Sequence, residues 1–329
     1  MFNAEKCDFC GKCLEFCPYI KYDHDRAVVE MKELVAGGTP PIVSSCVTCA
    51  ACNQACPTGA NPFDLLNDRQ EETGALGVPQ AALDNFSKLH NLPTVIKQGD
   101  PGRPVMNLCI VGDMVREQLN TPLFKGLTTI EGADYFCTVG YVHLGKPSLM
   151  KAQARKYVDK LAALNAEEIV CFHDDCYMML TALADEFGIK VPFRPVHLFE
   201  FLYKELSVRQ DVKKLSLKVA YQAPCASRYT AEKDKYLDML FELMGVERVP
   251  RKYDGLNGLC CGAPLMARDK DRALEVKTWN IDDAKNFGSD AMVFLCPMCY
   301  LNLRKLTRDQ NMEALFISEL CNKAISKEP

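Results

Sequence analysis

The sequence lacks several features that mark common functional classes. Its 329 residues carry a net charge of −4 and no dense run of lysine and arginine, which argues against a nucleic-acid surface. No uninterrupted apolar stretch approaches the length of a membrane span; the densest, Ala291–Cys296, ends at Pro297. Neither a G-x-G-x-x-G nor a P-loop motif occurs. We therefore expect no nucleic-acid partner and no direct membrane insertion, and we expect any flavin to lie on another subunit.

A targeting segment is also missing from the given sequence. Only six residues precede Cys7, and they do not have the pattern of a signal peptide. We therefore expect a cytoplasmic protein whose membrane contact, if it has one, is made through a partner. In that compartment thiols stay reduced, so its cysteines are better interpreted as metal ligands than as disulfides.

Cysteine is what the sequence has in abundance, with 18 residues. Eight of them form two runs with the spacing C-x2-C-x2-C-x3-C-P, which is typical of a two-cluster ferredoxin. In that arrangement the fourth cysteine of each run binds the other cluster. Disulfides or zinc are the alternatives, but zinc sites use paired C-x2-C units. We expect two cubane [4Fe-4S] clusters, one on Cys7, Cys10, Cys13 and Cys56 and the other on Cys46, Cys49, Cys52 and Cys17.

The hydrophobic pattern divides the chain into segments and predicts an α + α/β fold class. Residues 1–75 favour a mostly helical two-cluster ferredoxin-like domain. A linker rich in glycine and proline follows at 76–104, with a short helix near Ala81–Leu89. Beyond it, short apolar strands alternate with amphipathic helices, which predicts two α/β subdomains at 105–212 and 213–329.

These two α/β segments repeat each other. Glu168–Tyr177 matches Ala291–Tyr300 position for position, and each segment reads as a strand that runs into a helix. Helices are expected before both, at Ser148–Leu164 and Asp269–Phe287. We therefore expect two pseudo-repeated subdomains.

A third group of cysteines lies in the second repeat. Cys225 is followed after 34 residues by Cys260-Cys261-Gly262, and after another 34 by Cys296-x2-Cys299. Each group falls at a predicted boundary between a strand and a loop, and such loops gather at the carboxyl edge of a parallel sheet. Five thiolates exceed the four that a cubane uses, so one sulfur could bridge two irons.

This pattern resembles the cysteine-rich CCG domain found in the catalytic component of heterodisulfide reductase. Related domains occur in the iron–sulfur subunits of anaerobic glycerol-3-phosphate dehydrogenase, glycolate oxidase and lactate-utilising enzymes. The N-terminal part resembles the ferredoxin-like component of heterodisulfide reductase, so the order fits a fusion of these two components. The resemblance implies a non-cubane [4Fe-4S] cluster, and zinc is the alternative. Its ligands would be Cys225, Cys260, Cys261, Cys296 and Cys299.

The first repeat departs from this pattern. Its counterparts of the cluster ligands are Asp113 for Cys225, Cys137-Thr138 for the cysteine pair, His173 for Cys296 and Cys176 for Cys299. Cys109 and Cys171 lie on the adjoining strands. In one interpretation this half has lost its cluster, and its cysteines are small buried apolar residues. In the other, a zinc or iron ion is bound by Cys137, Cys176, His173 and either Asp113 or Cys109. The sequence favours the first interpretation.

These features favour an iron–sulfur electron-transfer subunit of a multi-subunit oxidoreductase. It would pass electrons between a flavoprotein dehydrogenase, or another redox subunit, and a second acceptor. The alternative is a heterodisulfide reductase with catalysis at the non-cubane cluster. That chemistry resembles a mechanism with one cluster in each repeat, whereas this chain keeps one full set of five cysteines. A metal-stapled scaffold with zinc in its C-terminal half is the third hypothesis. The sequence identifies no catalytic residue.

Overall fold

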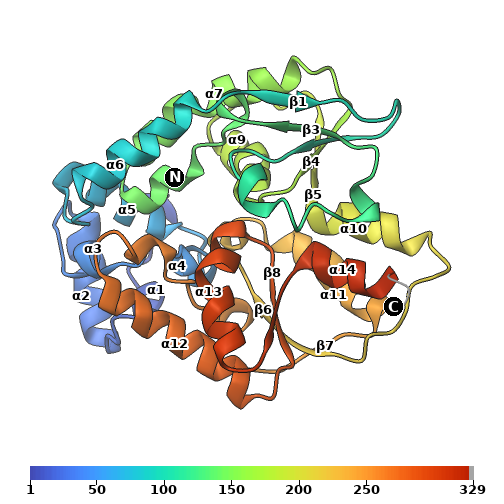
Figure 1. Ribbon diagram of the computed structural model, residues 1–329. Helices are drawn as coiled ribbons and strands as arrows, with labels where there is room; N and C mark the ends of the chain where they lie inside the picture. Colours follow the sequence, from blue (N-terminus) through green and yellow to red (C-terminus); the bar gives the residue numbers. More distant parts are fainter. Residues whose placement is uncertain (326–329) are drawn as a thin grey trace.

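The N-terminal part of the chain is a small helical module. A computed structural model describes residues 1–325. The module carries short helices next to the cysteine runs and two longer ones that pack beside them (Figure 1). These helices are α1 (Lys12–Glu15), α2 (His24–Val35), α3 (Ile42–Ser45), α4 (Ala51–Ala55) and α5 (Pro62–Thr73). The helical character expected for residues 1–75 is therefore present.

The two longer helices of the module are formed by local signals and by apolar spacing. Asp23 caps α2 by accepting a hydrogen bond from the backbone N–H of Arg26, and Pro62 occupies the first turn of α5. Met31 and Leu34 of α2 and Leu66 of α5 share a buried core with cluster cysteines. Packing of these helices therefore fixes the loops that carry the cysteines.

The next part of the chain forms a five-stranded sheet with the order β1-β3-β2-β4-β5. Its edge strand β1 is antiparallel to β3, and the remaining pairs are parallel. The strands are β1 (Val95–Lys97), β2 (Val105–Asn107), β3 (Thr128–Glu131), β4 (Glu168–Cys171) and β5 (Arg194–His197).

The segment expected to be a linker is more ordered than the sequence suggested. It contains the expected short helix as α6 (Gln80–Ser87), but it also contributes strand β1. This strand escaped prediction because it has only three residues and all are exposed, so it shows no alternation of buried and exposed positions.

The last part of the chain forms a four-stranded parallel sheet with the order β7-β6-β8-β9. Its strands are β6 (Lys218–Gln222), β7 (Glu247–Arg248), β8 (Ala291–Phe294) and β9 (Glu313–Phe316). The order of its strands repeats the order β3-β2-β4-β5 of the first sheet. The matching sequence segments therefore occupy equivalent places, on β4 and β8. The subdomain boundaries at 104 and 212 stay predictions.

Helices flank both sheets and connect their parallel strands, because parallel neighbours need a crossover connection. Those of the first sheet are α7 (Pro147–Ala162), α8 (Asp174–Met178), α9 (Ala184–Glu186) and α10 (Leu198–Ser207), with a π-helical turn at Met179–Leu183 between α8 and α9. Those of the second are α11 (Asp234–Met244), α12 (Lys270–Asn286), α13 (Pro297–Asp309) and α14 (Ile317–Ile325). The expected helices at 148–164 and 269–287 are α7 and α12.

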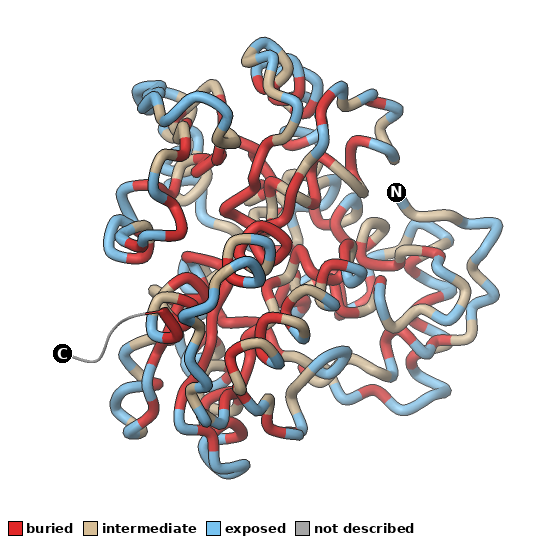
Figure 2. Tube along the Cα trace, turned by 90° about the vertical axis from the view of Figure 1, so that its right-hand side faces the viewer, coloured by how far each residue is buried: buried red, intermediate tan, exposed pale blue. Residues whose placement is uncertain are grey.

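One hydrophobic core joins the two sheets, and buried backbone runs through the middle of the molecule (Figure 2). It combines Phe172, which follows β4, with Phe316 of β9; their rings stack with centroids 5.3 Å apart. In the described part of the chain, no helix has both the length and the apolar character needed to cross a membrane.

The helical module is fixed against both sheet-containing parts. Asn67 of α5 donates a 2.9 Å hydrogen bond to the carbonyl of Val142, in the first part. Arg228, in the second, donates a 2.6 Å bond to Gln54. Because it contacts both parts, the module holds its cysteine loops at a defined position relative to each sheet.

Candidate metal centres

The two cysteine runs of the helical module build two separate sites. One small cavity is lined by Cys7, Cys10, Cys13 and Cys56. A second is lined by Cys17, Cys46, Cys49 and Cys52, with Cys13 between the two. The fourth cysteine of each run thus reaches the other site, which is the grouping that the spacing predicts. We call them site I (Cys7, Cys10, Cys13, Cys56) and site II (Cys17, Cys46, Cys49, Cys52).

Both runs wind around their site with the same backbone geometry. Residues two and four positions after the first cysteine have positive φ: Phe9 and Gly11 in the first run, Thr48 and Ala50 in the second. At Gly11 there is no room for a side chain, because an added Cβ would lie 2.7 Å from the backbone nitrogen of Val28.

Backbone amides and one hydroxyl group point at the cysteine sulfurs. The N–H of Thr48 donates to Cys46 Sγ at 3.3 Å, and the N–H of Ala60 donates to Cys56 Sγ at the same distance. The hydroxyl of Thr58 lies 3.4 Å from Cys56 Sγ. Hydrogen bonds to cluster sulfurs are one means by which a protein adjusts a reduction potential.

Burial makes these thiols poor acids when no metal is bound. It raises the pKa of both Cys13 and Cys17 to about 12. Each site therefore gathers neutral thiols that a cation must deprotonate on binding. Iron–sulfur clusters fit this donor set, because a cubane takes four thiolates.

The five cysteines of the second repeat also meet in one place. Cys225 begins a short 3-10 helix, Cys260 and Cys261 lie in a loop, and Cys296 and Cys299 lie at the start of α13. Thiol hydrogen bonds link Cys225 to Cys260, Cys260 to Cys261, Cys261 to Cys299 and Cys299 to Cys296. We call this group the CCG site. Five connected sulfurs fit a cluster with more thiolate ligands than a cubane.

The CCG site lies directly beside site II. The backbone N–H of Cys260 donates a 2.7 Å hydrogen bond to the phenolic oxygen of Tyr19, two residues after Cys17. Tyr19 is buried in a cluster that includes Cys260, with Cys17, Cys49 and Cys225 packed against it. Cysteines of the two sites are close enough that Cys225 raises the pKa of Cys49, after the larger effect of burial.

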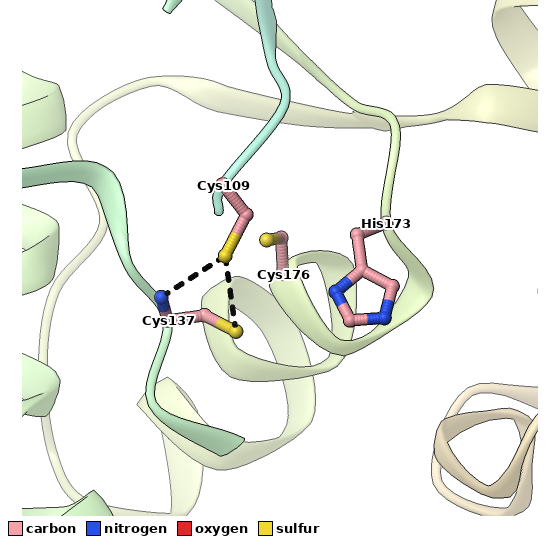
Figure 3. A group of neighbouring side chains, drawn as sticks. All are labelled: Cys109, Cys137, His173 and Cys176. Atoms are coloured by element: carbon pink, nitrogen blue, oxygen red, sulfur yellow. Dashed lines mark hydrogen bonds between the residues drawn. The ribbon is translucent and has the colours of Figure 1, made fainter. Parts of the chain in front are cut away.

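The first repeat brings four potential ligands together. The ligand atoms of Cys109, Cys137, Cys176 and His173 all lie within 4.8 Å of one another, and all four residues are buried (Figure 3). Cys109 Sγ lies 3.7 Å from Cys137 Sγ and accepts a 3.5 Å hydrogen bond from the Cys137 N–H. We call this group the Cys3His group. The interpretation that the cysteines here are only small apolar residues does not explain this convergence.

Asp113 does not belong to the group. Its side chain is 78% exposed and pairs with Arg116 at 2.6 Å. The sheet register explains the error. Val105 pairs with Ile169 as Ala220 pairs with Met292, so the counterpart of Cys225 is Ile110, next to Cys109. Cys171 is also outside: its thiol lies 3.9 Å from the carbonyl of Ile169.

The Cys3His group and the CCG site face each other. His173 Nε2 lies 3.8 Å from Cys296 Sγ, and these two residues occupy the same position in the two repeats. A cavity of about 300 Å³ opens beside them, with side chains from both groups and mostly apolar walls. Its cysteine lining is Cys109, Cys137, Cys225, Cys261, Cys296 and Cys299.

Charge in this region is unusual for buried thiols. A hydrogen bond from Cys299 and the proximity of His173 lower the pKa of Cys296 to about 7, against the opposing effect of burial. Burial lowers the pKa of His173, but Asp175 and the surrounding thiols outweigh it and raise the pKa well above its usual value. The region is therefore suited to a cation bound by thiolates.

The sequence analysis missed three residues of this region. Tyr19 directly follows the Cys-Pro of the first run, which was the available signal. His143 had no partner at ligand spacing; it lines the cavity and lies 3.0 Å from Thr48 Oγ1. Asp175 was expected to be a first-turn residue of a helix, and its carboxylate lies 3.5 Å from His173 Nε2.

Comparison with known proteins agrees with this division of sites. A family model described as a 4Fe-4S dicluster domain matches residues 1–57. The model of the CCG family, described as a cysteine-rich domain, matches residues 219–304. The chain is a CCG-domain iron–sulfur protein. Its ferredoxin and CCG domains make it an electron-transfer protein.

Two further similarities cover most of the CCG-domain protein. It is 23% identical over 319 residues to a "Probable membrane-anchored ferredoxin" of Chromohalobacter salexigens. That alignment covers 84% of the chain but only 47% of the relative, so the chain spans about half the relative's length. The fold is similar to a crystal structure of a hypothetical protein from Helicobacter pylori, with a TM-score of 0.63 at 11% identity over 95% of this chain and 70% of that one.

Proposed function

We propose that this CCG-domain protein is the electron-transfer subunit of a larger oxidoreductase, with cubane [4Fe-4S] clusters at sites I and II and a non-cubane [4Fe-4S] cluster at the CCG site. The hydrogen bond between Tyr19 and Cys260 carries this proposal. Sites I and II share Cys13 as a common lining residue, and Tyr19 fills the space between site II and the CCG site. The three sites therefore form an unbroken series.

Site I is the natural point of contact with a redox partner. Its Cys7 and Cys10 are partly exposed, whereas Cys260, Cys261, Cys296 and Cys299 of the CCG site are buried. Phe9, between Cys7 and Cys10, is also at the surface. A flavoprotein dehydrogenase, or another redox subunit, would dock over this loop. Association of the complex with a membrane would be made through that partner.

The CCG site is then the other end of the series. Its cysteines line the cavity of about 300 Å³, which is large enough for part of a small molecule. This cavity also favours a second candidate function, reduction of a disulfide at the CCG site. In that reaction two electrons and two protons break one S–S bond and leave two thiols. Electrons would enter through site I in both cases.

The order of the sites can be tested by freeze-quench EPR with a reduced flavodoxin as a one-electron donor. Such a protein is too large to enter the cavity, so its electrons must come through the surface. Reduction of the CCG site should follow that of the cubanes. In Cys46→Ser, which removes a ligand of site II, it should slow by at least about 10-fold. Cys321→Ser, a buried cysteine of α14, is the control.

An unchanged rate at the CCG site in Cys46→Ser would contradict the proposed series. The second candidate is tested separately, by turnover of a small organic disulfide with reduced viologen. Turnover by the chain alone, lost in Cys261→Ser, would favour disulfide reduction over electron transfer to another acceptor. No turnover would favour the electron-transfer role.

A further inference from the structure

We propose that the Cys3His group of the first repeat binds a single tetrahedral zinc ion through Cys109, Cys137, Cys176 and Nδ1 of His173. The proposal does not depend on the electron-transfer function. It rests on the geometry of these four side chains, which come from three separate segments of the first part of the chain (Figure 3).

The separation of the ligand atoms fits one ion and not a cluster. Zinc–sulfur bonds of about 2.3 Å in a tetrahedron hold two sulfurs about 3.8 Å apart. Cys109 Sγ and Cys137 Sγ lie 3.7 Å apart, and all four ligand atoms lie within 4.8 Å of one another. In a four-iron cluster each thiolate binds a different iron, which requires wider spacing. Three sulfurs and one nitrogen around a closed tetrahedron are a zinc donor set.

His173 provides an independent indication of a missing ligand. The residue is only 7% exposed, and its Nδ1 is buried without a hydrogen-bond partner. A buried polar atom of this kind is costly unless it is paired. In Figure 3 the imidazole ring faces the three cysteines. A zinc ion at their centre would satisfy the nitrogen.

The other edge of the imidazole has the surroundings of a metal-bound histidine. His173 Nε2 lies 3.5 Å from the carboxylate of Asp175. A carboxylate beside the second nitrogen of a ligating histidine fixes its tautomer and orients its ring. The cavity that Cys109, Cys137 and His173 line gives the ion a path of entry.

A disulfide between Cys109 and Cys137 explains these observations less well. It would use two of the sulfurs and leave Cys176 and His173 Nδ1 without partners. It would also require the sulfurs to approach from 3.7 Å to a bond of about 2.0 Å. Zinc binding uses all four side chains at nearly their present positions.

The test is elemental analysis of the full chain, purified without oxygen, for zinc and iron. Wild type should contain about one zinc per chain, and Cys176→Ala should contain none while its iron is unchanged. Cys171→Ala is the matched control, because Cys171 is a buried cysteine of the same repeat outside the group. It should keep the zinc. Zinc retained in Cys176→Ala, or a wild type without zinc, would overturn the proposal, as would iron in this group instead of zinc.

Two further variants keep the proposal testable if Cys176→Ala fails to fold. His173→Cys should retain zinc, because four thiolates also form a zinc site, whereas His173→Leu should lose it. Asp175→Asn should weaken zinc binding by about 10- to 100-fold in competition with a chelator. Equal retention in His173→Leu and wild type, with no effect of Asp175→Asn, would show that zinc binds elsewhere.

Discussion

The phenolic oxygen of Tyr19 accepts a 2.7 Å hydrogen bond from the backbone N–H of Cys260, 241 residues away in the sequence. One residue lies two positions after a ligand of site II, and the other belongs to the CCG site. This bond fixes the distance between two groups of cysteines that belong to different parts of the fold. It makes the relative placement of the sites a built feature of the structure.

Removal of this bond should affect the CCG site and leave site I unchanged. Tyr19→Phe keeps the ring but leaves a buried N–H without its partner, which should lower the free energy of unfolding by about 1–3 kcal/mol. The loss of order beside Cys260 should also shift the midpoint potential of the CCG site. Urea unfolding and an EPR-monitored redox titration measure the two effects.

Tyr236→Phe is a suitable control for this variant. Tyr236 lies on α11 against Tyr203, with ring centroids 6.2 Å apart, and belongs to none of the metal centres. It should leave the potentials unchanged. Equal potentials at the CCG site in wild type and Tyr19→Phe would mean that the contact does not adjust that site.

Gly11 should be essential for site I. Gly11→Ala would place a Cβ 2.7 Å from a backbone nitrogen at a residue with φ of +69°, so the loop cannot keep its shape. We expect loss of about four irons per chain, the content of one [4Fe-4S] cluster. Gly74→Ala is a matched control, because its φ is +66° but its Cβ would meet no atom within 4 Å. That variant should lose about 1–2 kcal/mol from backbone strain and keep its iron. Equal iron in both variants would contradict this account.

A buried ion cluster holds the two repeats together and predicts a stability effect. Asp174, in the first repeat, accepts hydrogen bonds from Ser227 at 3.1 Å and from His197 at 2.9 Å. Lys233, which is almost fully buried, donates to Ser227 at 2.8 Å. Lys233→Met should leave the carboxylate without its cation and lower the unfolding free energy by about 3–5 kcal/mol.

Thermal or urea unfolding of this variant, with its iron content measured in parallel, checks the prediction. Lys235→Met, on the same helix, is the control, because Lys235 is exposed. A loss in Lys233→Met no greater than in Lys235→Met would show that the lysine does not compensate Asp174.

The CCG site and the cubanes should be separable by mutation. Cys261→Ser should abolish the spectrum of the CCG cluster, because Cys261 connects Cys260 with Cys299. The EPR signals of sites I and II should remain, since their ligands lie in another module. Cys321→Ser should leave all the signals intact. Loss of the cubane signals in Cys261→Ser would contradict the independence of these sites.

The cysteine grouping of sites I and II could be predicted because most of their ligands are neighbours in sequence. Spacing alone assigns Cys56 to site I and Cys17 to site II. The contact of Tyr19 with Cys260 could not be predicted, because it depends on how the helical module docks against the second sheet. No periodicity in the sequence reports docking of this kind.

The first repeat shows where sequence reasoning fails in a different way. Alignment of the repeats placed Asp113 opposite Cys225, whereas the strand register places Ile110 there and brings Cys109 into the group. Loops of different length after equivalent strands cause this error. Cys109 was considered a strand residue, but it lies just beyond β2 with φ of +57°, which turns the chain toward Cys137.

The central claim is that this chain carries three iron–sulfur clusters in series, with zinc beside the last. An anaerobic count of iron, sulfide and zinc, combined with EPR of the reduced and oxidised protein, tests it most directly. The account predicts about twelve irons, since each [4Fe-4S] cluster holds four, and about one zinc per chain. It also predicts a signal from the oxidised CCG cluster beside those of ordinary reduced cubanes. About eight irons with two zinc ions would contradict the account, because the CCG site would then hold zinc and could not carry electrons.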